Sequence, residues 1–460
     1  MPFKRISMFL ALPLLALGGC QTVESLGDHT AALVGLGDDS PNAYASSSVS
    51  EVQHTGIAVA DEPLAARAGA AVLGSGGSAA DAAAAMFFAM TATYPVAAGL
   101  GGGGICLVRD ASGQVTEFDF LTRAPARQGA YAVPGAVRGF ADMQKQFGQL
   151  PWQRVVAPGE ALAATGFPIS EALSVRLASA QNIVRLDAGL AAEFLDESGQ
   201  PRATGSEARN LALSQTLGQI RLSGADGFYK GMIAAKLEAY SNAQGGAVTL
   251  DELAAVKTQS GAARARGVGE FTVYMPGGRT GAGVFTASLL DNLSRQRGNV
   301  AGAASQALAA FGVANLPQDL GSTGFAAVDA GGQAASCAVT LNGPFGSGRT
   351  AGDTGVQLAA SPAGGHGLAS AFLAPLIVAG GNGLALAAAG AGGPKGAAAA
   401  LNAVLDVAGG RPLGRRGDLR GTGNAPFDTV NVISCDGETC VALSDPGAHG
   451  AGAVAETASN

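Results

Sequence analysis

The apolar residues near the start of the chain fall into short blocks with two kinds of spacing. The runs at residues 56–60 and 105–108 are short and contain Ile and Val, which is typical of buried strands. The longer runs at 64–73 and 80–93 are typical of helices, and the stretch 99–104 is dense in Gly. The pattern therefore predicts a strand, two helices, a loop and a second strand, in that order.

Residues that commonly start or end helices stand at the boundaries of both predicted helices. Pro63 stands near the start of the first helix, where a missing N–H costs nothing, and the Gly-rich stretch 74–77 is a natural stop. Ser78 can cap the second helix, and Asp81 lies in its first turn, where the helix dipole favours a negative charge. These residues support the two helices independently of the apolar pattern.

The later part of the chain changes pattern twice. Residues from about 131 to 320 are mostly helical with polar loops, and strand-like blocks return from residue 322 onward. Apolar runs at 325–328 and 334–341 flank an Asp-Ala-Gly-Gly sequence at 329–332. We expect these runs to form two strands joined by a turn.

The last long apolar segment is rich in Ala. Its part at 397–407 predicts a helix, and the Ala/Gly stretch 385–400 is interpreted as a turn that leads into this helix. Strands at both ends of the chain with helices between them predict an α+β fold whose layers draw on both ends.

The first twenty residues have the pattern of an export signal. Lys4 and Arg5 precede an apolar run at 8–17, which is shorter than an ordinary membrane-spanning helix. The sequence Leu-Gly-Gly before Cys20 resembles a bacterial lipobox, which implies lipidation of Cys20 and anchoring in a membrane. Gln21 follows, which implies sorting to the outer membrane, facing the periplasm. A plain signal peptide with an incidental Cys is the alternative.

Composition and charge narrow the class of protein. Of the 460 residues, 47% are hydrophobic and 14% are charged, which excludes a disordered chain. The net charge is −7 and no basic patch is evident, which argues against nucleic acid as a partner. Only four His are present, none at ligand spacing to a Cys pair, so we expect no metal and no cofactor. The polar stretch 21–53 is interpreted as a flexible tether after the signal at 1–20.

Four further Cys follow Cys20. Cys435 and Cys440 flank an Asp-Gly turn between two strand-like runs, and an exported hairpin of this kind permits a disulfide. Two reduced thiols remain the alternative there. Cys106 and Cys337 lie in apolar runs and are predicted to be buried small hydrophobic residues.

An ordered series of short motifs resembles the gamma-glutamyltransferase family. The motifs include Gly-Gly-Ser-Ala-Ala-Asp-Ala-Ala at 76–83, and others lie at 63–65, 99–104, 133–139, 166–170, 340–342, 345–348 and 444–446. The resemblance implies an N-terminal-nucleophile hydrolase fold, a four-layer αββα sandwich. It also implies a precursor that cuts itself into a large part, 54–321, and a small part, 322–460, which together form one globular domain.

The same resemblance assigns the chemistry. Ser322 takes the nucleophile position, with Thr323 as the fallback if the register slips by one residue. A hydroxyl is a weak nucleophile, and a freed α-amine with a pKa of roughly 8 can act as its base. Thr340 matches the hydroxyl that hydrogen-bonds the nucleophile, and Gly392 and Gly393 match a Gly-Gly turn whose N–H groups form an oxyanion hole. Uncleaved turn hydroxyls are the alternative at 322 and 323.

Several positions depart from the family pattern for binding glutamate. Leu121 stands where the family has an Arg, and Arg123 follows two residues later as a possible substitute. Other departures are Ser361, Gly364 and the Ala371-Phe372 pair, while Asn342 is retained and Arg349 and Lys395 are further candidate cations. Each lost charge-assisted contact costs about 1.5–3 kcal/mol, so we expect weaker glutamate recognition.

Two hypotheses of different classes follow. The first is a self-cleaving amide-bond hydrolase or transferase, whose small-molecule donor is a gamma-glutamyl compound such as glutathione or an amide that needs less charge recognition. The second is a noncatalytic envelope lipoprotein that keeps the fold. An unrelated Ala/Gly-rich envelope protein is a third reading, which the ordered motifs disfavour.

Overall fold

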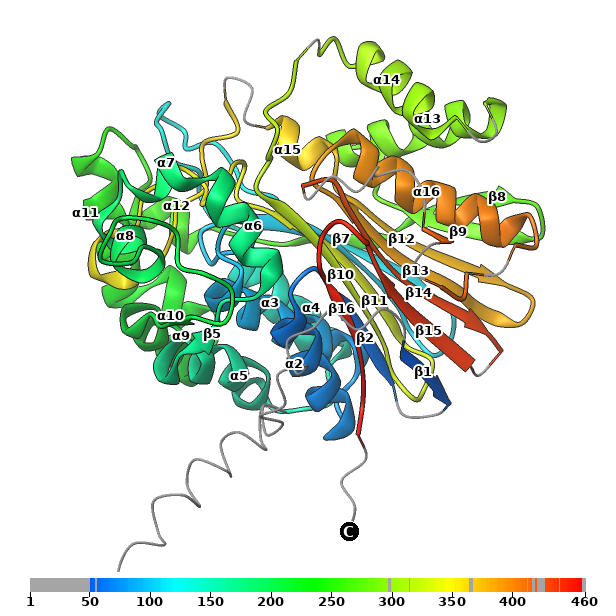
Figure 1. The fold of residues 1–460 in the computed structure, drawn as a ribbon, viewed down its shortest axis with the longest axis horizontal. Coiled ribbons are helices and arrows are strands. Elements are labelled where there is room, and N and C mark those ends of the chain that lie inside the picture. The colour runs from blue at the N-terminus through cyan, green and yellow to red at the C-terminus, as the bar shows by residue number, and fades with distance from the viewer. Residues whose placement is uncertain are drawn as a thin grey trace, which may run out of the picture.

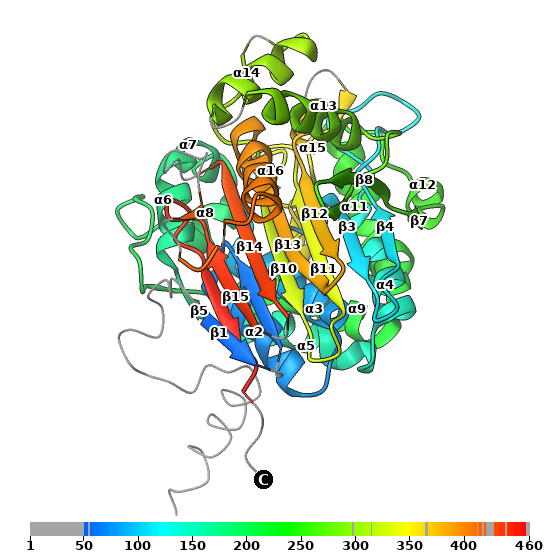
Figure 2. The same cartoon turned by 90° about the vertical axis from the view of Figure 1, so that its right-hand side faces the viewer.

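Two antiparallel sheets packed face to face form the centre of the protein, and helices cover both outer faces (Figures 1 and 2). The computed structural model describes residues 50–53, 56–296, 299–313, 315–363, 367–411, 413–415, 418–419, 427–437 and 439–456. The predicted signal at 1–20, with Cys20, and most of the predicted tether lie outside the described residues. The last four tether residues form strand β1 (Ser50–Gln53).

The first sheet, which holds the nucleophile candidate, mixes strands from both ends of the chain. Its order is β16 (Ala451–Val454), β2 (Ile57–Ala60), β10 (Ser322–Val328), β11 (Ala334–Thr340), β3 (Gly103–Arg109), β4 (Val115–Asp119) and β7 (Gln259–Ala262). The second sheet has the order β1, β15 (Thr439–Ser444), β14 (Thr429–Asp436), β13 (Gly383–Ala391), β12 (Ala374–Gly380), β9 (Phe271–Met275) and β8 (Arg264–Val268).

The two sheets meet over small and β-branched side chains. Val59, Ala326 and Ile433 belong to one buried cluster between the sheets. Gly324 of β10 lies so close to β13 that a Cβ placed on it would be 2.7 Å from the carbonyl oxygen of Ala389. Because interiors are close-packed, such residues allow a close approach of the sheets beside the start of β10.

One helical layer covers the first sheet. It contains α2 (Pro63–Gly74), α3 (Ala79–Thr93), α4 (Ala136–Phe147), α5 (Trp152–Thr165), α6 (Glu171–Ser179), α7 (Gln181–Val184), α8 (Ala188–Phe194), α9 (Leu211–Ser223), α10 (Asp226–Tyr229), α11 (Gly231–Ala243) and α12 (Leu250–Ala254). The ribbon β5 (Phe167–Pro168) with β6 (Glu207–Ala208) joins loops there. Helix α3 is buried on all sides, and the predicted caps are present: Ser78 accepts from the Asp81 N–H in a capping box.

A second helical layer covers the other sheet. It contains α13 (Gly281–Arg295), α14 (Val300–Ala310), α15 (Leu368–Ala371) and α16 (Pro394–Ala408). Helix α16 packs on β13 and β14 through a buried Ala and Leu face. The order helix, sheet, sheet, helix confirms the predicted four-layer α+β fold.

One prediction about local structure was wrong, and another was incomplete. Residues 383–391 form the central strand β13 and not a turn into a helix, because a continuous apolar run suits a doubly covered strand as well as a helix. The middle region is mostly helical, as predicted, but it also contributes the short strands β7, β8 and β9. Strand β7 is exposed at each of its positions, so it carries no apolar alternation that would reveal it.

Two disulfides are present. Cys435 and Cys440 are joined across the β14–β15 hairpin, which agrees with the disulfide alternative. Cys106 and Cys337 are buried, as predicted, but the prediction missed that they form a disulfide between the paired strands β3 and β11, with Cα atoms 4.1 Å apart. The register of these distant strands is not visible in the sequence.

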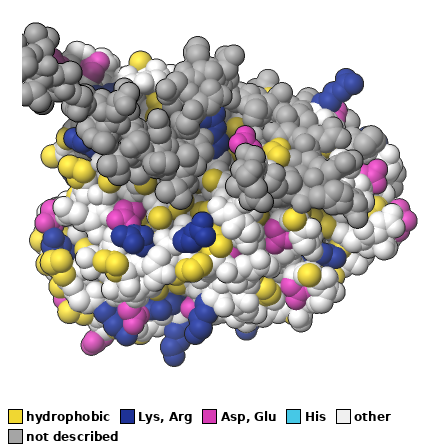
Figure 3. All heavy atoms as spheres, turned by 90° about the horizontal axis from the view of Figure 1, so that it is seen from below, with side chains coloured by type: hydrophobic (Ala, Val, Ile, Leu, Met, Phe, Trp, Pro, Cys, Tyr) yellow, Lys and Arg dark blue, Asp and Glu magenta, His cyan; other side chains and the backbone are white. Residues whose placement is uncertain are grey.

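The surface seen in Figure 3 carries both signs of charge. Lys and Arg side chains lie there among Asp, Glu and apolar side chains, scattered over a mostly uncharged surface. Within the described part of the chain, no helix combines the length and apolar character needed to cross a bilayer.

Candidate active site

Ser322 begins strand β10 directly opposite Thr340 of β11. Both side chains are buried, and the Ser322 hydroxyl donates to Thr340 Oγ1 at 2.9 Å. Thr340 Oγ1 also accepts from the N–H of Asn342 at 2.9 Å and donates to the carbonyl oxygen of Gly321 at 3.1 Å. The pair thus connects the nucleophile candidate with the carbonyl group of the peptide bond before it.

The chain turns sharply before Ser322. Gly321 has φ +60, and a Cβ there would overlap the carbonyl oxygen of Gly343. The Gly321 carbonyl accepts a second hydrogen bond, from the N–H of Leu341 at 2.9 Å. Gly is required at residue 321 for two reasons: the backbone has a left-handed conformation, and the backbone of Gly343 leaves no room for a side chain.

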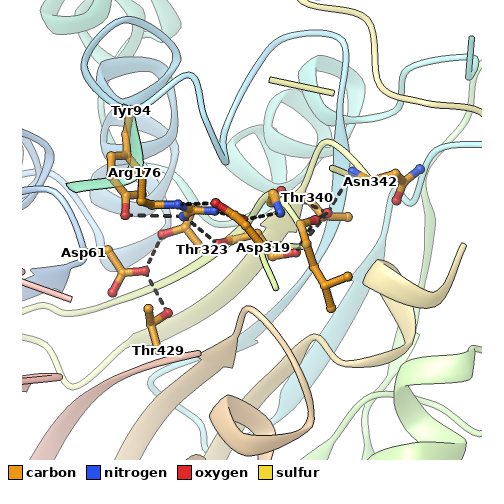
Figure 4. Close-up of polar contacts among 11 residues, drawn as sticks. Asp61, Tyr94, Arg176, Asp319, Thr323, Thr340, Asn342 and Thr429 are labelled. Atoms are coloured by element: carbon orange, nitrogen blue, oxygen red, sulfur yellow. Dashed lines mark hydrogen bonds and ion pairs between the residues drawn. The ribbon is translucent and has the colours of Figure 1, made fainter. Parts of the chain in front are cut away.

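Thr323, the fallback nucleophile, points to a different set of partners. It donates to Asp61 Oδ2 at 2.7 Å, and Thr429 donates to the same carboxylate at 2.8 Å (Figure 4). Asn431 also donates to this carboxylate, at 2.6 Å. Burial raises the pKa of Asp61, while the hydrogen bonds from Thr323, Asn431 and Thr429 oppose that rise. Because successive strand residues point in opposite directions, the geometry favours Ser322 over Thr323.

A buried cation that sequence reasoning missed lies beside Ser322. Arg176 of α6 donates through Nη1 to the carbonyl oxygen of Ser322 at 3.2 Å and to Tyr94 Oη at 3.3 Å. Its Nε donates to Asp319 Oδ2 at 2.9 Å, and Nη2 donates to Asp319 Oδ1 (Figure 4). Burial by itself would lower the pKa of Arg176, but the charges of Asp319 and Tyr94 and the hydrogen bonds to both together outweigh it, and the pKa is raised. The sequence held one sign of this buried cation: Arg176 follows Leu173 by three residues, so both lie on the same face of the helix.

Gly392 and Gly393 connect β13 to α16. Gly392 has φ +87, and a Cβ there would overlap the carbonyl oxygen of Phe427. A Cβ on Gly393 would lie 3.9 Å from the Leu320 side chain, so the Gly pair borders the segment before Ser322. The pair also precedes the first turn of α16, where the helix dipole favours negative charge and the Asp428 carboxylate accepts from the N–H groups of Lys395 and Gly396.

Two cavities lie on either side of the segment 317–320. The first, of about 330 Å³, is lined by Asp319, Asn342 and Arg349 among others. The second, of about 390 Å³, is lined by Gly392, Gly393 and Lys395 among others. Pro317 and Leu320 line both, so this segment lies between the two spaces.

The two predicted substrate-binding residues, Asn342 and Arg123, line different cavities. Asn342 has φ +61 and donates to Thr122 Oγ1 at 3.0 Å and to the Ala360 carbonyl at 2.9 Å. Its Oδ1 is buried without a hydrogen-bond partner, at the edge of the first cavity. An orphaned acceptor of this kind is available to a donor on a ligand.

Arg123 is not brought together with these groups. Its side chain is exposed and donates to the Lys257 carbonyl at 3.3 Å. It lines a third cavity, of about 190 Å³, which has no lining residue in common with the other two. Arg349 is also exposed and donates to the Leu186 carbonyl, while Gly364 lies outside the described residues.

The four layers, with a buried hydroxyl at the start of an inner strand, define the N-terminal-nucleophile hydrolase fold. The structure is similar to cephalosporin acylase from Bacillus halodurans, with a TM-score of 0.71 at 18% identity over 89% of this chain and 97% of that one. The family model for Gamma-glutamyltranspeptidase matches residues 65–309. The chain therefore belongs to the gamma-glutamyltranspeptidase family, and the match ends before Ser322.

Curated relatives carry two kinds of name. A "Glutathione hydrolase proenzyme" of Pseudomonas sp. (strain A14) is 32% identical over 240 residues, which are 47% of this chain and 42% of that protein. An "Acylase ACY 1 proenzyme" of Pseudomonas sp. (strain SE83) is 32% identical over 226 residues, which are 43% of this chain and 40% of that protein. The matches thus span less than half the length of these relatives.

Proposed function

We propose that the chain cuts itself between Gly321 and Ser322 and then acts as an amide-bond hydrolase or transferase with Ser322 as nucleophile. The observation that carries this proposal is the buried hydroxyl pair of Ser322 and Thr340, 2.9 Å apart and hydrogen-bonded to the Gly321 carbonyl. A weak hydroxyl nucleophile needs an adjacent acceptor for its proton, and this arrangement supplies one.

The cut begins with attack of Ser322 Oγ on the carbonyl carbon of Gly321. The C–N bond before Ser322 breaks, and the Ser322 nitrogen takes the proton that leaves the hydroxyl. The Thr340 hydroxyl and the Leu341 N–H both donate to the Gly321 oxygen and stabilise the negative charge that develops there. Water then hydrolyses the ester, which leaves a carboxylate on Gly321 and a free amine on Ser322.

The freed amine then serves as the base for the second reaction. It accepts the Ser322 hydroxyl proton as Oγ attacks a substrate amide, and it returns the proton to the leaving amine. The N–H groups of Gly392 and Gly393 are the proposed oxyanion hole, because they border the segment before Ser322 at a helix N-terminus. Water or an acceptor amine then resolves the acyl ester on Ser322.

The proposed donor is a gamma-glutamyl compound such as glutathione, or an amide that depends less on glutamate's charged groups. The names of the relatives, glutathione hydrolase and acylase, support this range of amides. The position of Leu121 and the exposed site of Arg123 favour the second kind of donor. Asn342 Oδ1 is the proposed acceptor for a substrate N–H.

A noncatalytic envelope lipoprotein is the second candidate. It is favoured by the same loss of glutamate contacts, since Leu121 and the pair Ala371-Phe372 offer no charge. In either case we propose export, lipidation of Cys20 and an outer-membrane location facing the periplasm. The proposed parts are a signal at 1–20, a tether at 21–53, and the two halves 54–321 and 322–460.

Turnover of an amide separates the two candidates. Purified wild-type protein, Ser322→Ala and Thr323→Val are incubated with gamma-glutamyl and simple acyl p-nitroanilides, and release of nitroaniline is measured. The proposal predicts turnover that Ser322→Ala abolishes and Thr323→Val retains. Equal background rates in all three proteins would support the noncatalytic lipoprotein instead.

A further inference from the structure

The first cavity begins next to the nucleophile candidate. Leu320, Asn342 and Gly343 belong to its lining. The carbonyl oxygen of Leu320 lies 3.3 Å from the hydroxyl oxygen of Ser322. The position that a Cβ on Gly321 would take lies 1.9 Å from the carbonyl oxygen of Gly343. A group bound at this end of the cavity would therefore be close to the carbonyl carbon that Ser322 attacks.

Most of the wall of this cavity is apolar and comes from separate parts of the chain. Helix α7 and the residues after it form one side, and α15 forms another. Leu186, at the end of the first side, is 69% exposed, so it leaves apolar surface open to a ligand. Such a pocket favours an apolar group, because burial of apolar surface is favourable. The apolar lining residues include Ile183, Leu186, Pro317, Leu320, Leu368 and Ala369.

The charged side chains of this cavity are poorly placed to bind an ionic group. Among the described lining residues these are Asp319, whose carboxylate is paired with Arg176, and Arg349, which is exposed and donates to a backbone carbonyl. An anionic ligand group would also be repelled by Asp319. The polar atoms left without a hydrogen-bond partner are uncharged: Asn342 Oδ1 and Ser347 Oγ.

We propose that the first cavity binds the acyl chain of the substrate, and that this chain is an uncharged aliphatic group of medium length, such as hexanoyl. The substrate class is then N-acyl amides without a charged acyl group. This inference rests on the proposed function, since it needs Ser322 as the nucleophile. It agrees with Leu121, which packs against a buried apolar cluster that includes Leu373 and Ala391.

The second cavity suits the amine half of the amide better than the acyl chain. Gly392 and Gly393, the proposed oxyanion hole, line it, and so do the charged residues Lys395 and Asp428. Charged groups of this kind favour a polar ligand group, because a polar group loses free energy when it is buried without a partner. The amine half of an amide varies more in polarity than an aliphatic acyl chain does, so the two cavities separate the two halves of the substrate.

The test compares acyl groups that differ in the length of an uncharged chain. Acetyl and hexanoyl p-nitroanilides are given to the mature wild-type protein, and release of nitroaniline is measured. Burial of each methylene contributes about fourfold, so the inference predicts a kcat/KM at least about tenfold higher for the hexanoyl compound. The gamma-glutamyl compound should have a lower kcat/KM than the hexanoyl compound, because the cavity offers no partners for its charges.

A side chain that fills the first cavity should remove this preference. Ala369→Leu adds carbons to the wall of the first cavity and should lower the hexanoyl-to-acetyl ratio about tenfold or more. Ser305→Leu adds bulk at an exposed residue of the second cavity and should leave the ratio unchanged. A ratio that falls in Ser305→Leu and not in Ala369→Leu would overturn the inference.

A competition measurement on the wild-type protein covers the case in which Ala369→Leu does not fold. Hexanamide should inhibit turnover of the acetyl substrate at a concentration at least about tenfold lower than acetamide does. Ser322-dependent turnover without any preference for the hexanoyl chain would overturn this inference and leave the proposed function standing. A protein that cleaves none of these amides above the Ser322→Ala background would overturn both.

Discussion

Cys106 and Cys337 form a disulfide between neighbouring strands, and they lie on opposite sides of the Gly321–Ser322 bond. A cut at that bond therefore leaves two polypeptides that remain covalently joined. The disulfide joins β3 and β11, which belong to the same sheet as Ser322, and both of its Cys residues are buried.

We predict that the mature protein migrates as one full-size species without reductant and as two smaller species with reductant. Gel electrophoresis of unheated and heated samples, with and without dithiothreitol, measures this directly. In Cys106→Ala/Cys337→Ala the two species should separate without reductant, whereas Cys435→Ala/Cys440→Ala should behave as wild type, since both Cys lie in the small part. Separation of wild-type halves by detergent alone would contradict the linkage.

Removal of the Thr340 hydroxyl should slow the cut. Thr340→Val keeps the shape of the strand residue but loses the acceptor for Ser322 and the donor to Gly321. We expect processing about 100-fold slower, because a positioned proton-transfer group typically contributes that much. Thr340→Ser should process at close to the wild-type rate, and a time course on reducing gels provides the measurement. Equal rates for Val and Ser would remove Thr340 from the mechanism.

Close approach of the two sheets should make Gly324 intolerant of a side chain. In Gly324→Ala the new Cβ meets the Ala389 backbone, and we expect a loss of about 2 kcal/mol or more of unfolding free energy. Gly267→Ala is the matched control, since nothing lies within 4 Å of its Cβ position on edge strand β8. Gly267→Ala should change the unfolding free energy by no more than about 0.5 kcal/mol, as measured by urea denaturation. Similar losses for both variants would contradict the packing argument.

The stability of the protein should fall as pH rises because of Glu193. Burial raises the pKa of this carboxyl from 4.5 to about 8, and Asn210 is its hydrogen-bond donor. The folded state holds the proton more tightly, so the stabilisation is complete below about pH 4.5 and is lost as pH rises through 8. At about 1.4 kcal/mol per pKa unit, the upper limit is about 5 kcal/mol.

Glu193→Gln should therefore flatten the dependence of unfolding free energy on pH between about 5 and 9. Glu197→Gln, an exposed neighbour, should keep the wild-type slope. Denaturant unfolding at three pH values provides the comparison. A Glu193→Gln slope equal to that of wild type would show that the buried carboxyl does not titrate in this range.

The sequence predicted the parts of the fold that have local signals. Ser78 and Asp81 mark the start of α3, and the Gly-rich turns mark its boundaries, because caps and turns act within a few residues. Strand β13 was mistaken for a turn and helix, since burial on both faces removes the alternation that distinguishes a strand.

The candidate site was predictable only where a motif carried it. Ser322, Thr340 and the Gly392-Gly393 pair came from the family resemblance, and the fold brings the first two into contact. Arg176, Asp61 and the Cys106–Cys337 bond depend on contacts between residues more than a hundred positions apart. No local pattern encodes such contacts, so sequence reasoning missed them.

N-terminal sequencing of the reduced mature protein shows whether the chain is cut between Gly321 and Ser322. If Ser322 is freed by self-cleavage, one fragment begins Ser-Thr-Gly-Phe in the wild type and in Thr323→Val, and no such fragment forms in Ser322→Ala. A single chain that continues through Gly321 and Ser322 in all three proteins would exclude self-cleavage and Ser322 as an N-terminal nucleophile.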